Sequence, residues 1–189
     1  MINWSQHPKI NLAVHLLHQQ GVVAYPTEAV WGLGCDPWSE EAVARVLDLK
    51  GRAEHRGLIL IGCHWDQFKP YLNGLDQQQQ SNLQKTHKKP ITWLIPDNGC
   101  APPWIVGNHD TLAVRVTSHP VAAALCKAYG GPLVSTSANP QGLPAATSGF
   151  KVRRYFSKSL DYQTPGRVGA ATKASEIRHL LTGEVIRPG

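Results

Sequence analysis

The sequence lacks the long apolar runs and the cysteine patterns of membrane, disulfide-rich or zinc-binding proteins. No apolar stretch approaches the roughly 20 residues that a membrane-spanning helix needs. The cysteines stand singly, with no C-x-x-C pair and no histidine at zinc-finger spacing. The first residues lack the basic and apolar regions of a secretory signal. We therefore expect a cytoplasmic protein without membrane contact, with four reduced thiols at Cys35, Cys63, Cys100 and Cys126.

Several familiar catalytic motifs are also missing. The sequence has no G-x-x-x-x-G-K-[ST] loop, no H-E-x-x-H and no G-x-S-x-G. Gly32 and Gly34 begin like a dinucleotide fingerprint, but Pro37 stands where its third glycine is needed. His15 and His18 lie three residues apart on an expected helix, and we interpret them as surface or half-buried residues. No metal site built from protein side chains is identified.

What the sequence does contain is the composition of one globular domain with a basic surface. Its 189 residues suffice for one core, and we expect a single domain over residues 1–189. Apolar residues make up 42% and charged residues 17%, which excludes a disordered chain. The net charge of +6 favours a polyanionic partner, such as a nucleotide, a tRNA or a ribosome, and a solvated surface with a cationic bias explains it equally well.

Apolar periodicity predicts alternating helices and strands. The spacing predicts helices at residues 10–20, 39–51, around 77–80, at 121–129 and at 149–158, and strands at 22–25, 58–61, 91–95, 111–116, 133–135 and 184–186. Residues 96–110 are rich in glycine and proline, which is typical of a long loop. The alternation favours an α/β fold with a largely buried sheet. Its irregular spacing argues against a purely parallel order.

Two groups of residues follow early elements of this pattern. Thr27 and Glu28 come after the proline that ends a strand, and we interpret the segment from Trp31 to Gly34 as a loop that a ligand can approach closely, or as an ordinary turn. Lys50-Gly51-Arg52, with Arg56 farther on, suits a polyphosphate. Helix C-termini attract cations in any case, so this second group alone is weak evidence for a polyphosphate site.

Two further groups lie in the second half of the chain. Arg115 stands within a strand, so it either faces a cleft as a carboxylate clamp or lies on an exposed edge. Residues 135–142 are dense in hydroxyl and amide donors, which suit phosphate and oxyanion binding. No histidine follows at a spacing that would activate a serine. We therefore expect catalysis by positioning and charge neutralisation.

In their order along the chain, these groups are more specific than any one alone. Pro-Thr-Glu, Trp-Gly-Leu-Gly, Lys-x-Arg, Ala-Val-Arg-Val and Ser-Thr-Ser-Ala-Asn-Pro-x-Gly together resemble the threonylcarbamoyl-AMP synthase family, also called YrdC-like. The resemblance runs from about residue 10 to the C-terminus and is similar to the short bacterial form. It implies a single-domain α/β fold, a twisted, mixed open sheet with flanking helices and a concave basic face.

The resemblance also implies a reaction and its substrates. L-threonine, bicarbonate and ATP, with Mg²⁺ accompanying the ATP, give L-threonylcarbamoyladenylate, pyrophosphate and water, which is a nucleotidyltransferase reaction. Other proteins then transfer the threonylcarbamoyl group to adenosine 37 of tRNAs that read codons starting with A. The partners implied are these small molecules and the transferase machinery that receives the product.

Family similarity assigns roles to individual residues. It implies that Lys50 and Arg52 are catalytic, that ATP is bound by Lys50, Arg52, Ser137, Asn139, Thr111 and Ser175, and that threonine is bound by Thr27, Arg115 and Ser135. The sequence departs from the commoner family pattern at Trp31, Ala53, Arg56-Gly57, Ile61 and Glu176.

Two alternatives belong to other classes. Basic runs at 85–89 and 151–154, the second beside Tyr155 and Phe156, would suit an RNA-binding module in contact with tRNA or double-stranded RNA, with the aromatic rings stacked on bases. Solvated helix faces explain the same runs. The third class is the related domain of larger carbamoyltransferases for hydrogenase maturation, whose extra domains and zinc-finger cysteines are missing here.

Overall fold

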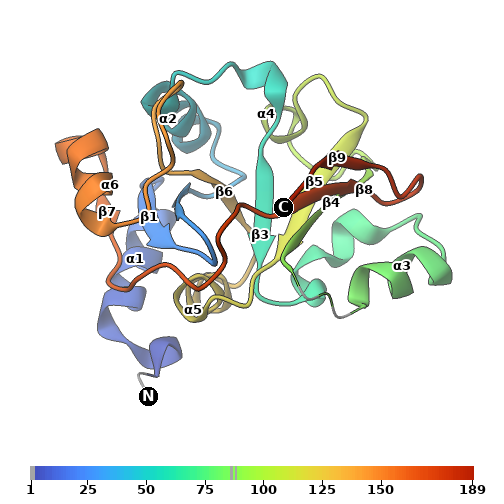
Figure 1. The fold of residues 1–189 in the computed structure, drawn as a ribbon, viewed down its shortest axis with the longest axis horizontal. Coiled ribbons are helices and arrows are strands. Elements are labelled where there is room, and N and C mark those ends of the chain that lie inside the picture. Colours follow the sequence, from blue (N-terminus) through green and yellow to red (C-terminus); the bar gives the residue numbers. More distant parts are fainter. Residues whose placement is uncertain (1–2, 86, 88) are drawn as a thin grey trace.

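The computed structural model describes residues 3–85, 87 and 89–189, and within them a single mixed sheet runs through the molecule (Figure 1). Its order is β7-β1-β2-β6-β3-β5-β4-β8-β9. The strands are β1 (Val23–Pro26), β2 (Trp31–Gly34), β3 (Ile59–Gly62), β4 (Ile91–Pro96), β5 (Thr111–Val116), β6 (Leu133–Ser137), β7 (Tyr162–Gln163), β8 (Glu176–His179) and β9 (Val185–Arg187). Parallel pairs join β3 to β5, β4 to β8 and β1 to β7, and the other pairs are antiparallel.

Helices cover both faces of this sheet. The α-helices are α1 (Pro8–His18), α2 (Glu40–Lys50), α3 (Gln77–Gln84), α4 (Pro103–Val106), α5 (Pro120–Tyr129) and α6 (Gly149–Phe156), and the 3-10 helices are η1 (Trp4–Gln6), η2 (Glu54–Arg56), η3 (Trp65–Leu72) and η4 (Ser157–Ser159). The predicted ends of α2 are confirmed, since Ser39 Oγ accepts the amide of Ala42 and Gly51 is left-handed, with φ of 59°.

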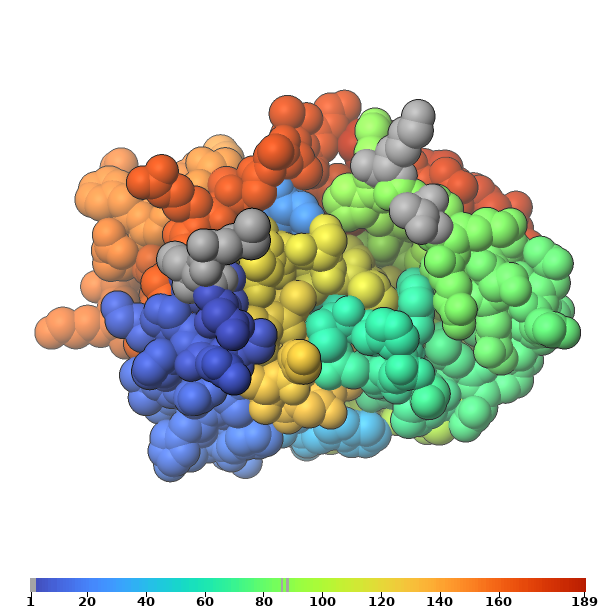
Figure 2. All heavy atoms as spheres, turned by 90° about the horizontal axis from the view of Figure 1, so that it is seen from below, coloured from blue at the N-terminus to red at the C-terminus, as the bar shows by residue number. Residues whose placement is uncertain are grey.

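The apolar core is divided by the sheet. On one face, Ile10 and Leu17 of α1 pack with Val121 and Leu125 of α5 against β1. Figure 2 shows the N-terminal helix, α5 and η3 side by side on the surface, and Gln67 Nε2 of η3 donates to the carbonyl of Cys126 at 2.8 Å. A second buried cluster contains Val43 and Val46 of α2, Leu83 of α3 and Ile105 of α4, together with residues of β3, β4 and β5. Phe68 of η3 belongs to this cluster as well.

The largest correction to the sequence prediction is β2. Residues 31–34 form a strand between β1 and β6, not a loop. Glycine has low strand propensity, so the local pattern does not indicate a strand. Packing requires Gly34, because a Cβ there would lie 2.7 Å from the Tyr25 ring, whereas a Cβ on Gly32 would only touch that ring, at 3.4 Å. The fully buried Tyr25 thus occupies the space that the two glycines leave open.

Smaller corrections concern short elements. The expected loop 96–110 contains α4, β6 extends to Ser137, and the expected helix 149–158 ends at Phe156 and continues as η4. The last strand is 185–187, one residue later than expected, and the strands β7 and β8 were not predicted. Strands of two to four residues have too few positions for a period of two to stand out, and their pairing partners are remote in the sequence.

We expect Gly34→Ala to lower the free energy of unfolding by about 1–3 kcal/mol, because the new Cβ meets the Val134 carbonyl and the Tyr25 ring. Gly131→Ala is the matched control, since its Cβ would approach no atom closer than 3.7 Å. Urea denaturation of both variants measures the difference. Equal stability of the two variants would contradict the close packing of β1 on β2.

Candidate active site

A cleft of about 420 Å³ opens over the middle of the sheet. Its floor crosses four strands, because Leu94 of β4, Ala113 of β5, Ile59 of β3 and Ser135 of β6 lie in register and all line it. These residues share the sheet face with Ile61, which lies fully buried in the core beneath α5. The cleft is therefore the part of this face that α5 leaves uncovered.

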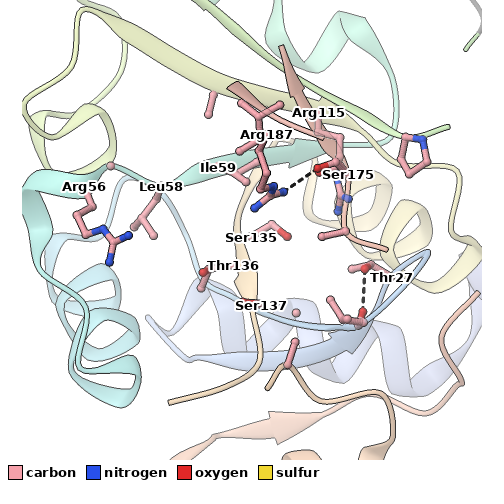
Figure 3. Close-up of a pocket in the computed structure, with 18 of the residues that line it drawn as sticks. Thr27, Arg56, Leu58, Ile59, Arg115, Ser135, Thr136, Ser137, Ser175 and Arg187 are labelled. Carbon is pink, nitrogen blue, oxygen red and sulfur yellow. Dashed lines mark hydrogen bonds between the residues drawn. The ribbon is translucent and has the colours of Figure 1, made fainter. Parts of the chain in front are cut away.

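Apolar side chains line much of the cleft, and the polar side chains among them are chiefly cations and hydroxyls (Figure 3). The cations are Arg52, Arg56, Arg115, Lys173 and Arg187, and the hydroxyl groups belong to Thr27, Thr111, Ser135, Thr136, Ser137 and Ser175. Glu28 also lines the cleft. A cleft with this charge balance favours a ligand with several negative charges.

Arg115 lies in an interior strand, which excludes the exposed-edge interpretation. It is 8% exposed on β5, between β3 and β4, and its Nη1 lies 3.5 Å from Glu28 Oε2. Among the described residues its Nε has no hydrogen-bond partner. Because Arg115 lines the cleft and its five N–H donors exceed what Glu28 can accept, the guanidinium keeps donor capacity for a ligand carboxylate.

Glu28 holds Arg115 and the start of α5 together, a role that was not predicted from the sequence. Its Oε1 accepts the Thr117 hydroxyl at 2.6 Å and the Ser118 amide at 3.0 Å. Burial raises the pKa of Glu28, but the Arg115 guanidinium and these hydrogen bonds outweigh burial, so the pKa lies below its ordinary value. The sequence feature that could have indicated this role is the position of Glu28 in the Pro-Thr-Glu motif, next to Thr27.

Two of the predicted threonine-side residues lie on the same cleft wall. Thr27 is 4% exposed in the β1–β2 turn, and its hydroxyl donates to the Val30 carbonyl at 2.7 Å. Ser135 on β6 is 6% exposed and lines the floor. With Arg115 they converge on one end of the cleft, where Figure 3 shows all three. Ile61, where the resembled family often has histidine, is too deeply buried to reach it.

The predicted nucleotide-side residues separate into two groups. Arg52 lines the cleft, and its Nη2 donates to the carbonyl of Gly57 at 2.9 Å, while its Nε has no partner among the described residues. Ser137 also lines it. Lys50 and Asn139 are not among the described residues that line the cleft. Lys50 is 6% exposed and its Nζ lies 2.9 Å from the Asn139 carbonyl.

Thr111 and Ser175 also line the cleft, and Figure 3 shows Ser175 close to Arg115. Thr111 begins β5 and is half-buried. The Ser175 hydroxyl shares a 2.7 Å hydrogen bond with Thr92, and the Ser175 carbonyl accepts from Arg187 Nη2 at 2.7 Å (Figure 3). Arg187 and Lys173 were missed, because they belong to a C-terminal segment with no local motif and reach the cleft only through the pairing of β8 and β9.

The described residues contain no cluster of three His, Cys, Asp or Glu side chains that could hold a metal ion. The one carboxylate in the described cleft wall, Glu28, is engaged by Arg115, Thr117 and Ser118. A divalent ion in this cleft would therefore have to bring most of its ligands with a phosphate-bearing substrate.

The two basic runs, at 151–154 and 85–89, differ in how far the structure describes them. Arg153 and Arg154 are exposed on α6, but Phe156 is 3% exposed and cannot stack on a base, which corrects that expectation. The Tyr155 ring lies under the Lys151 ammonium. In the run at 85–89, positions 86 and 88 lie outside the described residues. No helix in the described part of the chain has the length and apolar character to cross a membrane.

Comparison with known proteins gives full-length matches. A profile of the Sua5/YciO/YrdC family, described as telomere recombination, matches residues 15–189. A threonylcarbamoyl-AMP synthase of Cellvibrio japonicus is 53% identical over 188 residues, covering 100% of both chains. One from Saccharophagus degradans is 49% identical over 188 residues, covering 99% of this chain and 98% of the other.

Solved structures share the fold. P. abyssi Sua5, complexed with L-threonine, superposes with a TM-score of 0.88 at 28% identity. The match covers 95% of this chain but 54% of that one, so this chain spans about half of its length. Full-length HypF in a phosphate- and nucleotide-bound form has a TM-score of 0.78 at 18% identity, covering 90% of this chain and 27% of that one, and shows the fold alone. These matches confirm the α/β class with a mixed sheet.

We expect Glu28→Gln to lower the free energy of unfolding at pH 7 by about 3 kcal/mol, because it leaves the buried Arg115 charge unpaired. The pair contributes fully above the ordinary glutamate pKa and is lost as pH falls through the lower pKa of folded Glu28. The stability difference between wild type and variant should therefore close as the pH falls well below about 4. Urea denaturation across this range measures it.

The control for this pH series is Glu184→Gln, which removes an exposed carboxylate in the turn before β9. Its stability should stay within about 0.5 kcal/mol of wild type at every pH. If the stability lost in Glu28→Gln does not change with pH, the shape of the Glu28 side chain and not its charge stabilises the fold.

Proposed function

This chain belongs to the Sua5/YciO/YrdC family, and we propose that it is a threonylcarbamoyl-AMP synthase that makes L-threonylcarbamoyladenylate from L-threonine, bicarbonate and ATP. The observation that carries this function is 53% identity to a synthase over the whole of both chains. The product is the first intermediate in forming N6-threonylcarbamoyladenosine at position 37 of tRNAs that read codons starting with A. The enzyme works in the cytoplasm.

The reaction has two steps. The threonine amine and bicarbonate form a carbamate with loss of water. A carbamate oxygen then attacks the α-phosphorus of ATP, and pyrophosphate leaves with the electrons of the broken P–O bond. Because an adenylyl group moves from one oxygen to another, the enzyme is a nucleotidyltransferase. Carbamate, threonine carboxylate and ATP all carry negative charge, so the protein must bring like charges together.

Threonine is held at the wall formed by Thr27, Arg115 and Ser135. The Arg115 guanidinium binds the threonine carboxylate, and the two hydroxyls orient the rest of the amino acid. This proposal is supported by the place of the Arg115 guanidinium in the cleft wall and by the L-threonine complex of P. abyssi Sua5, a protein of the same fold. A pocket that fixes threonine near the nucleotide makes the second step effectively intramolecular.

ATP is held along the cleft by Arg52, Ser137, Thr111 and Ser175, with Lys50 and Asn139 behind this wall. The cations Arg56, Lys173 and Arg187 extend the same surface, and fixed positive charge stabilises the departing pyrophosphate. Magnesium enters as part of the MgATP substrate, where it neutralises phosphate charge. The protein's own contribution is to bind, to orient and to exclude water.

Contact with RNA is a separate proposal. The exposed Arg153 and Arg154 of α6 can attract phosphates. Of the aromatic residues on this helix, Phe156 is buried, Tyr155 is half-buried under Lys151, and Phe150 is exposed. The proteins that receive the intermediate are also partners by inference from the reaction. Neither is needed for the adenylation itself.

We expect the purified protein to release pyrophosphate from MgATP only when both threonine and bicarbonate are present. Omitting either substrate, or replacing threonine by serine, should leave background release. A coupled phosphate assay after pyrophosphatase measures the rate. Release that does not depend on threonine or bicarbonate would exclude this function.

Arg115→Ala should lower kcat/KM for threonine by roughly 10- to 100-fold, because charge-assisted hydrogen bonds to the carboxylate are lost. The KM for ATP should change much less. Arg154→Ala is the matched control on α6 and should leave both constants unchanged. If Arg154→Ala reduced the rate and Arg115→Ala did not, the α6 surface would be the functional site.

A further inference from the structure

Lys50 occupies an unusual position for a residue expected to touch ATP. Its ammonium group faces three oxygens of the loop after β6, namely the carbonyl of Ser137, the carbonyl of Asn139 at 2.9 Å and Asn139 Oδ1 at 3.4 Å. Its exposed fraction is 6%, and it is absent from the described cleft lining. The side chain therefore points at protein carbonyls and not at the space where phosphates would lie.

The donors of this ammonium group are already used. A protonated lysine has three N–H donors, and three acceptors surround Nζ. A phosphate could be bound only by displacing one of them, and among the described residues the Asn139 carbonyl has no other donor. Arg52, two residues later, differs in that it lines the cleft, although its Nη2 donates to the Arg56 and Gly57 carbonyls.

A second contact binds the same loop to the end of α2. The Gln141 amide donates to the Lys50 carbonyl at 2.7 Å, so one residue holds the loop through its backbone and its side chain. Asn139 completes the arrangement, because its Oδ1 accepts the Ser137 hydroxyl at 2.6 Å and its Nδ2 donates to the Leu143 carbonyl at 2.8 Å. Ser137, at the start of this loop, lies in the cleft wall.

We propose that Lys50 is a positioning residue and not a phosphate ligand: it ties the loop at residues 137–141 to the C-terminus of α2 and so fixes Ser137 in the cleft wall. The kinetic consequence rests on the proposed synthase function. The tether itself is a property of the free protein and can be measured without any substrate.

Protonation controls this tether. Burial, and after it the neighbouring Arg52 guanidinium, lower the pKa of Lys50 to about 8. The neutral amine has two donors and cannot hold three acceptors. The tether should therefore weaken as pH rises through this value, and the Asn139 and Gln141 amides should report it in NMR spectra of the free protein. Lys50→Met should abolish that titration.

The first experiment is hydrogen exchange in the absence of nucleotide. In Lys50→Met, the amides of Asn139, Gln141 and Leu143 should exchange about tenfold faster than in wild type, which is the effect of losing roughly one hydrogen bond. Arg52→Met is the matched control and should leave these amides unchanged. If Lys50→Met does not fold, Lys50→Gln replaces it. Unchanged exchange in the Lys50 variant would overturn the proposal.

The second experiment compares pyrophosphate release among variants. Lys50→Met should lower kcat on the order of 10²-fold through the displaced loop. Lys50→Gln should recover part of this loss, because an uncharged amide still donates to carbonyls. Lys50→Met combined with Asn139→Ala should be little worse than the worse single variant, because both act through one loop. Losses that multiply, with no recovery in Lys50→Gln, would identify a direct phosphate ligand.

The two experiments separate the tether from the synthase function. If wild-type protein releases no pyrophosphate, the proposed function fails, while the exchange rates still decide whether Lys50 holds the loop.

Discussion

The buried ion pair between Arg115 and Glu28 is the constraint on which the cleft depends. An arginine on an interior strand requires a partner, because an unpaired buried charge is prohibitive. Glu28 can reach it only if the β1–β2 turn lies against the end of β5. That requirement places Thr27 next to Arg115 and fixes one wall of the cleft.

The same turn also positions the C-terminal segment. The Gly169 amide donates to the Thr27 carbonyl at 2.9 Å, and the Ala171 amide donates to the Glu28 carbonyl at 3.0 Å. A Cβ on Gly169 would lie 2.9 Å from the Glu28 carbonyl oxygen, so the close approach needs glycine. The chain then reaches Ser175 and β8, and β9 brings Arg187 into the cleft near Arg115 (Figure 3). The β1–β2 turn thus contacts β5 and the start of α5 through the Glu28 carboxylate, and the C-terminal segment through its backbone carbonyls.

Collecting cations in the cleft and behind its wall costs free energy. Burial, and after it a neighbouring guanidinium, lower the pKa values of Lys50, Arg52 and Arg187. The charged form of each of these side chains is therefore less stable than it would be in water. This cost is offset when a polyanion binds, which gives the cleft its preference for such a ligand. Protein carbonyls offset it at Lys50 in the free protein. The cations are therefore already in place in the free protein, and a bound polyanion stabilises their charged forms further.

Local patterns were sufficient for the longer elements. The Ser39 and Gly51 caps of α2 act within one turn, and the apolar face of α5 repeats along the whole helix, so both could be predicted without tertiary information. The strand β2 could not be predicted in this way, because the close packing of the Tyr25 ring on Gly34 is a tertiary contact. The strands β7 and β8 are defined by partners far away in the sequence, β1 and β4, and β8 pairs again with β9.

For the site, the sequence by itself determined the residue types and their grouping, because motifs such as Lys50-Gly51-Arg52 and residues 135–142 are contiguous. Only the tertiary structure decided their orientation. It turned Lys50 toward carbonyls, paired Arg115 with Glu28 and brought Arg187 from the last strand into the cleft. Side-chain direction depends on which acceptors lie within reach in space, and a linear sequence does not contain those distances.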